Sequence, residues 1–138
     1  MHNKGLLPIY TNSGDKIWRN KDGKLHRLDG PALESKDGSK AWYQDGLLHR
    51  IGGPAIEVFT GDKQWYKNGK RHRVDGPAIE WNNGVNEWWL NGKSFSSKEG
   101  FFDELTDEEK SIALFSDAFI NGTFTVIYRY FDIGLDDI

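Results

Sequence analysis

The chain has 138 residues, with 18 Lys and Arg against 21 Asp and Glu and a formal net charge of −3 at pH 7. This length suits one domain, or one repeat array with a cap, rather than two separate cores. The absence of cysteine excludes disulfides, thiolate metal sites and a cysteine nucleophile. No apolar run approaches the ~18 residues of a membrane helix, so we expect a cytoplasmic chain with no membrane partner.

The first predicted element is a degenerate half-unit that runs from Pro8 to Trp18. Terminal copies of a repeat array are atypical because one of their faces has no neighbour. A fourth unit starts at Trp88 but never reaches a His-Arg pair. We therefore predict one array over residues 1–95.

Between these ends one unit occurs three times at a step of 23 residues. Its pattern is Leu-His-Arg-x-(Asp/Gly)-Gly-Pro-Ala, with Arg71 in place of leucine in the third copy. The copies occupy residues 25–32, 48–55 and 71–78. A period of this length indicates an array whose neighbouring units bury each other's faces.

Two turns per unit predict the local structure. A glycine lies four residues before each tryptophan in Gly14/Trp18, Gly38/Trp42, Gly61/Trp65 and Gly84/Trp88. The turns that follow are Asp22-Gly23, Asp45-Gly46, Asn68-Gly69 and Asn91-Gly92, the dipeptides that suit a type I′ hairpin. The predicted fold is mainly β, an elongated antiparallel meander of 23-residue β-hairpin repeats with about two short strands in each.

Residues 96–138 predict a small α+β segment. Ser96 to Glu99 and Thr106 to Glu109 both fit a capping box, which predicts helices near 97–104 and 107–119. Ile112, Phe115 and Phe119 share one helix face, which we expect to close the open end of the array. The β-prone run 123–133 is then either core of this cap or the interface of a homodimer.

The run from Trp65 to Gly84 resembles the MORN repeat, which also combines an aromatic strand, an Asn-Gly turn, a Lys-x-His segment and further glycines. The resemblance covers residues 8–93, and it departs from the common pattern where Arg27, Arg50 and Arg73 replace a glycine. This variety is similar to repeats in proteins of bacteriophages and other large viruses. The resemblance implies a scaffold or docking surface in a viral accessory protein, acting in host takeover or counter-defence in the host cytoplasm, and it implies no reaction.

The stacked His-Arg pairs are the strongest candidate binding residues. Equivalent positions in adjacent hairpins lie roughly 9–10 Å apart, so three arginines would form a stripe that can hold phosphates or carboxylates. The alternative is that Asp29, Asp75 and a ladder of glutamates neutralise the stripe; Arg50, followed by Gly52 instead of Asp, is then the arginine we expect to be free. The candidates are His26, Arg27, His49, Arg50, His72 and Arg73, and the neutralising carboxylates are Asp29, Glu34, Glu57, Asp75 and Glu80.

Histidines that recur once per repeat are too far apart to converge on one ion, so we predict turn-stabilising hydrogen bonds, no metal site and no cofactor. Paired aromatics on opposite strand faces supply inter-repeat stacking or an exposed row that binds a partner. These are Trp42, Tyr43, Trp65, Tyr66, Trp88 and Trp89.

No nucleophile with its base is visible, so the predicted function is a non-catalytic module that docks on a host or viral protein. The alternative is a protein that sequesters a nucleotide or binds nucleic acid through the Arg and aromatic residues. Residues 1–95 carry 15 Lys and Arg against 11 Asp and Glu, and residues 96–138 carry 3 against 10. This basic excess is weak for a nucleic-acid binder.

Overall fold

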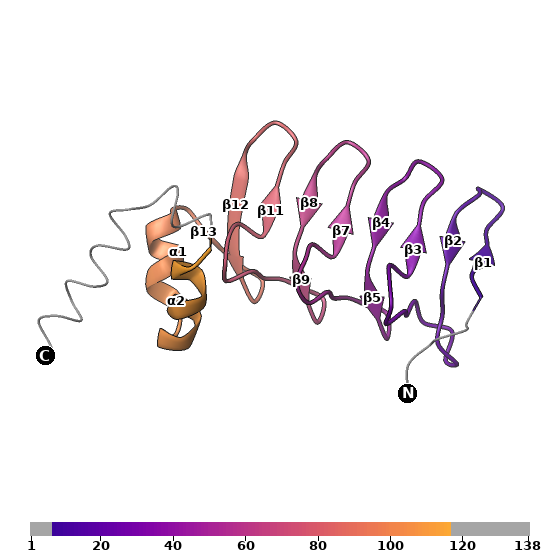
Figure 1. Cartoon of the computed structure of the whole chain (residues 1–138), viewed down its shortest axis with the longest axis horizontal. Coiled ribbons are helices and arrows are strands. Elements are labelled where there is room, and N and C mark those ends of the chain that lie inside the picture. The colour runs from indigo at the N-terminus through magenta and orange to yellow at the C-terminus, as the bar shows by residue number, and fades with distance from the viewer. Residues whose placement is uncertain (1–6, 117–138) are drawn as a thin grey trace, which may run out of the picture.

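The computed structural model describes residues 7–116. It has an elongated array of short antiparallel strands with two helices at its C-terminal end (Figure 1). None of the helices in this range is long and apolar enough to cross a membrane. The predicted strand 123–133, with its role in the cap or in a homodimer, lies outside the described residues, as does Phe119.

The main sheet confirms the predicted meander. Within residues 7–116 it contains nine strands, and every neighbouring pair is antiparallel. In spatial order they are β1 (Ile9–Tyr10), β2 (Lys16–Ile17), β3 (Leu33–Glu34), β4 (Lys40–Ala41), β7 (Ile56–Glu57), β8 (Lys63–Gln64), β11 (Ile79–Glu80), β12 (Asn86–Leu90) and β13 (Lys93–Phe95).

Each full repeat also has a second hairpin, which the sequence analysis did not separate from the first. These are β5 (Tyr43–Gln44) with β6 (Leu47–Leu48), and β9 (Tyr66–Lys67) with β10 (Lys70–Arg71). The two hairpins meet at the tryptophan: the N–H of Trp42 donates to Ala55, whereas its carbonyl accepts from His49. The tryptophan thus connects the main sheet to the second hairpin, and a repeat has about four two-residue strands.

The turn chemistry explains these second hairpins. Asp45, Asn68 and Asn91 have φ of 49°, 51° and 49°, and the glycine after each is also left-handed, as a type I′ turn requires. Asp22-Gly23 differs, because the first copy has one extra residue. There Asn20 and Lys24 flank a three-residue loop with only Gly23 at positive φ.

Neighbouring repeats are joined at the turns that contain Gly14, Gly38, Gly61 and Gly84. There, side chains of one repeat accept hydrogen bonds from the backbone of the next. The N–H of Lys36 donates to the Asp15 carboxylate at 2.9 Å, and that of Asn82 donates to the Asp62 carboxylate at 2.6 Å. The Ser39 hydroxyl accepts in the same way from Phe59 at 3.0 Å. These bonds are nearest-neighbour terms, which is how solenoids gain stability.

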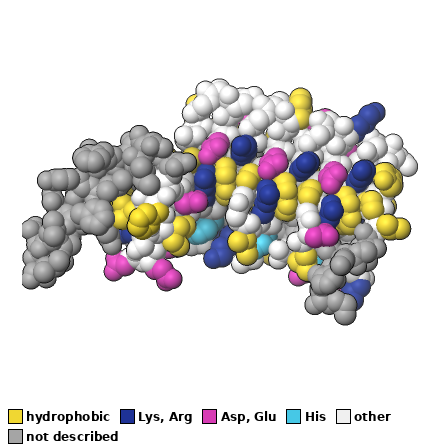
Figure 2. Space-filling view, viewed as in Figure 1, with side chains coloured by type: hydrophobic (Ala, Val, Ile, Leu, Met, Phe, Trp, Pro, Cys, Tyr) yellow, Lys and Arg dark blue, Asp and Glu magenta, His cyan; other side chains and the backbone are white. Residues whose placement is uncertain are grey.

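Charged side chains alternate across the main sheet. The register pairs Lys16 with Glu34, Glu34 with Lys40, Lys40 with Glu57, and Glu57 with Lys63. Figure 2 shows the resulting alternation of basic, acidic and hydrophobic side chains over the array. Opposite charges directly across strands stabilise a sheet and leave little net field on this face. The alanines of the Gly-Pro-Ala segments, Ala32, Ala55 and Ala78, are fully buried.

The helices close the C-terminal end of the array, but not through the predicted face. Phe101 of α1 (Lys98–Glu104) is fully buried, with its ring 5.0 Å from the Trp88 ring and 5.9 Å from the Phe95 ring. The buried cluster is Phe101, Phe102, Leu105, Ala113 and Leu114, packed against Val74, Trp88, Leu90 and Phe95. By contrast Ile112 and Phe115 are 52% and 83% exposed, so the predicted closing face was wrong for these two residues.

The helix boundaries follow their caps. Thr106 and Glu109 form the predicted capping box of α2 (Asp107–Leu114). In α1 the N-cap is Ser97 rather than Ser96, and its side chain accepts from Gly100, so no reciprocal glutamate bond completes a box. Helix α2 ends at Leu114, earlier than predicted, because both the N–H and the hydroxyl of Ser116 bond to the carbonyl of Ala113.

Candidate functional site

Each arginine of the His-Arg pairs stacks on a tryptophan of its own repeat. The guanidinium carbons of Arg27, Arg50 and Arg73 lie 3.9, 3.7 and 3.9 Å from the ring centroids of Trp18, Trp42 and Trp65. The Nη1 of each arginine also donates to the proline carbonyl of the same repeat, Pro31, Pro54 or Pro77, at 3.0–3.1 Å. Each arginine therefore connects the Gly-Pro-Ala segment of its repeat to the tryptophan of the same repeat.

Glutamates of the sheet neutralise this stripe. The ion pairs are Arg27 with Glu34 at 3.3 Å, Arg50 with Glu57 at 3.1 Å, and Arg73 with Glu80 at 2.9 Å. Arg27 and Arg73 have second pairs with Asp29 and Asp75. The expectation that Arg50 is free was wrong, because Glu57 of β7 reaches it. With a carboxylate on every arginine, the stripe offers little net charge to a phosphate.

The glycine before each proline is needed for space rather than for its φ angle. A Cβ at Gly30, Gly53 or Gly76 would lie 2.8, 2.9 or 2.7 Å from the guanidinium carbon of the arginine three residues earlier. None of these three glycines is left-handed. The sequence analysis missed this role, although the recurrence of Arg-x-x-Gly in all three copies was the signal for it.

The histidines stabilise turns, as the spacing indicated. The Nδ1 atoms of His26, His49 and His72 accept hydrogen bonds from the backbone N–H groups of Asp45, Asn68 and Asn91, at 2.9–3.0 Å. Each histidine thus holds the type I′ turn of the next unit and needs an unprotonated Nδ1 to do so. Burial lowers the pKa of His72, and Lys67 lowers it further, whereas Glu109 has a smaller opposite effect.

The predicted aromatic row is partly buried in every member. Trp42 and Trp65 lie against arginines, and Trp88 packs under the helical cap. Tyr43 pairs with Leu48 across its hairpin. The rings of Tyr66 and Trp89 lie 5.9 and 5.0 Å from the guanidinium carbon of Arg71. The tryptophans of the Arg stacks thus serve the array itself.

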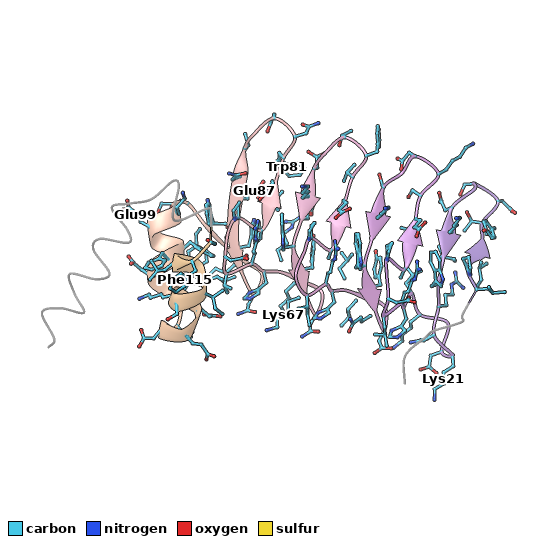
Figure 3. The ribbon with its side chains drawn as sticks, in the orientation of Figure 1. Lys21, Lys67, Trp81, Glu87, Glu99 and Phe115 are labelled. Atoms are coloured by element: carbon cyan, nitrogen blue, oxygen red, sulfur yellow. The ribbon has the colours of Figure 1, made fainter. Side chains whose placement is uncertain are left out.

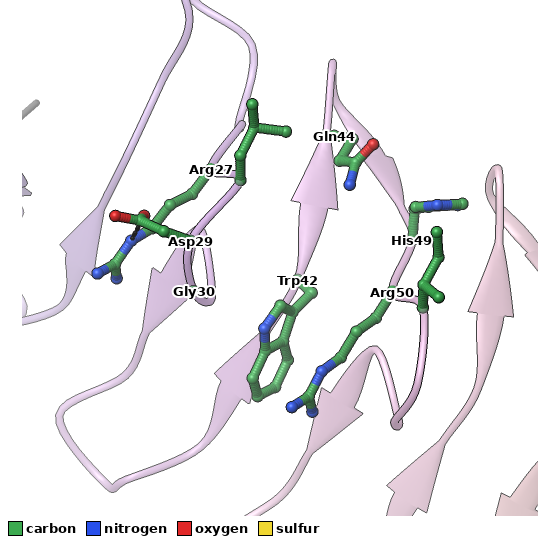
Figure 4. A pocket seen from close by; sticks show the side chains of 9 residues that line it. Arg27, Asp29, Gly30, Trp42, Gln44, His49 and Arg50 are labelled. Carbon is green, nitrogen blue, oxygen red and sulfur yellow. Dashed lines mark hydrogen bonds and ion pairs between the residues drawn. The ribbon is translucent and has the colours of Figure 1, made fainter. Parts of the chain in front are cut away.

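A groove of about 540 Å³ lies between the first two full repeats (Figure 4). Trp42, Arg50 and Ile51 line it from one repeat, and Leu28 and Gly30 line it from the other. Leu28 is 45% exposed and Ile51 is 87% exposed. The array therefore presents apolar side chains beside a groove.

The position after each His-Arg pair is apolar in all three copies, as Leu28, Ile51 and Val74. In the third copy Val74 is covered by the helical cap. A second groove, of about 500 Å³, is lined by Ile51, Val74 and Ile112 of α2, among others. The cap therefore shows how a helix can sit on this row, and Ile51, at 87%, is the most exposed of its three members. The sequence analysis did not single out this row.

In the described range 7–116 no group of three His, Asp or Glu side chains is arranged to hold a metal ion. No family model, curated protein or solved structure matches the chain.

Proposed function

We propose that this chain is a non-catalytic interaction module that docks on a partner protein. The docking surface is formed by the side chains of Leu28 and Ile51 and by the grooves beside them. The observation that supports this most is the exposure of Ile51, at 87%, beside a groove of about 540 Å³ in an array whose other motif residues bond internally. Apolar side chains at the rim of a concave surface favour protein interfaces.

The partner we propose presents a helix with an apolar face. The helical cap provides the internal precedent, since it covers Val74, the third member of the row, and places Ile112 in the groove that Ile51 also lines. A partner helix would extend that interface along the array by one or two repeats. In line with the resemblance to viral repeats, we place such a module in the cytoplasm of an infected host.

The test is a pull-down from host lysate with three forms of the chain: native, Ile51→Asp and Phe59→Asp. Phe59 is 65% exposed in the turn between β7 and β8, outside the residues that line the grooves, so its variant controls for general apolar adhesion. We expect a partner that the native chain and Phe59→Asp hold and Ile51→Asp loses. Equal loss in both variants, or retention in both, contradicts docking through this row.

A further inference from the structure

Arg71 is the residue at which the third repeat departs from the other two. The equivalent positions are Leu25 and Leu48, so the fold does not require a charge there. Arg71 lies in β10, directly across from Tyr66 of β9. A partly buried arginine where the repeat pattern has leucine needs its own explanation.

The side chain of Arg71 is held in place by aromatic residues. Its Nε donates to the Tyr66 hydroxyl at 3.1 Å, and that hydroxyl donates to the Gln64 side chain at 3.2 Å. The guanidinium carbon lies 5.0 Å from the Trp89 ring and 5.9 Å from the Tyr66 ring. Trp89 is held in turn by its bond to Glu87 at 3.1 Å. A guanidinium ordered in this way loses little rotamer entropy on binding.

Arg71 has no carboxylate partner among residues 7–116, in contrast to Arg27, Arg50 and Arg73. Within that range neither of its Nη groups makes a hydrogen bond, because the single bond of this side chain is the one from Nε to Tyr66. The two Nη groups are the pair of donors that binds a carboxylate side by side.

The surroundings of Arg71 are basic. The hairpin segments 66–71 and 89–94 carry Lys67, Lys70, Arg71 and Lys93 and no acidic residue, and of these four Lys93 is paired with Glu104 of α1 at 3.8 Å. Lys67 lies at the lower edge of the array in Figure 3, on the same hairpin as Arg71. Lys67 and Lys70 are exposed and attract an anionic group to this hairpin, whereas Arg71 provides the donors that would bind it.

We propose that Arg71 is the receptor for a carboxylate on an acidic segment of a partner protein, with Tyr66 and Trp89 as its walls. A nucleic acid would need a longer cationic track, and the arginines of the other repeats are neutralised by carboxylates. This inference goes beyond the proposed docking groove, and substitution of Arg71 leaves Leu28 and Ile51 in place.

The test is NMR titration of the arginine Nε–Hε signals of the full chain with the peptide acetyl-Glu-Glu-Glu-Glu-amide. Inorganic phosphate and a short oligothymidylate serve as the competing anions. We expect the peptide to shift the Arg71 signal. We expect the affinity of the Arg71→Leu variant for the peptide to be lower by about tenfold or more. Arg71→Leu restores the residue of the other two repeats and is therefore expected to fold; Arg71→Gln is the second variant.

The matched control is Arg19→Leu, which removes the same charge from an exposed arginine. It should change peptide affinity by less than about twofold, because exposed single charges contribute little to affinity. Equal weakening by Arg19→Leu and Arg71→Leu would reduce the site to general electrostatics and overturn the proposal. Absence of peptide binding, or tighter binding of phosphate or oligothymidylate, would overturn it as well.

Discussion

The stack of Arg50 on Trp42 should make arginine more stabilising than lysine at this position. The guanidinium lies 3.7 Å from the Trp42 ring centroid, an interaction of about 1 kcal/mol at a partly exposed site. The Nη1 bond to the Pro54 carbonyl at 3.0 Å adds about 1 kcal/mol. The pair with Glu57 adds roughly 0.5 kcal/mol, because the Glu57 side chain is 38% exposed.

A lysine keeps the charge but has no planar group to stack and donate at the same time. We therefore expect Arg50→Lys to lower the free energy of unfolding by about 2 kcal/mol and the midpoint of thermal unfolding by roughly 7 °C. The assay is thermal and urea unfolding followed by circular dichroism. Arg19→Lys, on an exposed arginine, is the control and should stay within about 0.5 kcal/mol of the native chain. Equal stability of the two variants would refute the stack as a stabilising feature.

Gly53→Ala should lower the free energy of unfolding by about 1–2 kcal/mol, because the new Cβ would displace the Arg50 guanidinium. Urea unfolding of the same substitution in an Arg50→Met background is the test. There the loss of stability should largely vanish, because no guanidinium is present to displace. The lowered pKa of His72 means that the unfolded chain binds the proton first as the pH falls. Stability should therefore decrease below about pH 6.5 and level off below the folded-state pKa. Urea midpoints from pH 7.5 to 5.5 measure this slope, which His72→Gln should reduce; an unchanged slope would remove His72 as its source.

The turns and the repeat period were predictable because they depend on local chemistry. Asn68-Gly69 and Asn91-Gly92 adopt the left-handed pair that their sequence predicts. Asp22-Gly23 has the same letters, but one extra residue in its copy lengthens the loop and leaves Asp22 outside the left-handed region. Dipeptide signals thus hold only when the loop length is also right.

The cap was less predictable because its burial depends on what the array presents to it. Phe101 is buried against Trp88 and Phe95, which lie on β12 and β13. Helical spacing alone favoured Ile112 and Phe115, but an eight-residue helix has too few turns for periodicity to select a face. The partner of Arg50 was missed for a different reason: the loop from Arg50 to β7 brings Glu57, seven residues later, back to the guanidinium, as it does for Arg27 with Glu34 and Arg73 with Glu80.

In this array the residues that recur in every copy maintain the fold, and we propose that recognition depends on the positions around them. The histidine holds the next turn, the arginine stacks on tryptophan, and the glycine makes room for the guanidinium. A residue with such an internal role cannot change partners without loss of stability, so it is a poor place for recognition. Arg71 stands where the other copies have leucine, so its bond to Tyr66 is not part of the recurring framework, and Ile51 is 87% exposed. For the same reason, substitution at these two positions should alter binding at little cost to folding.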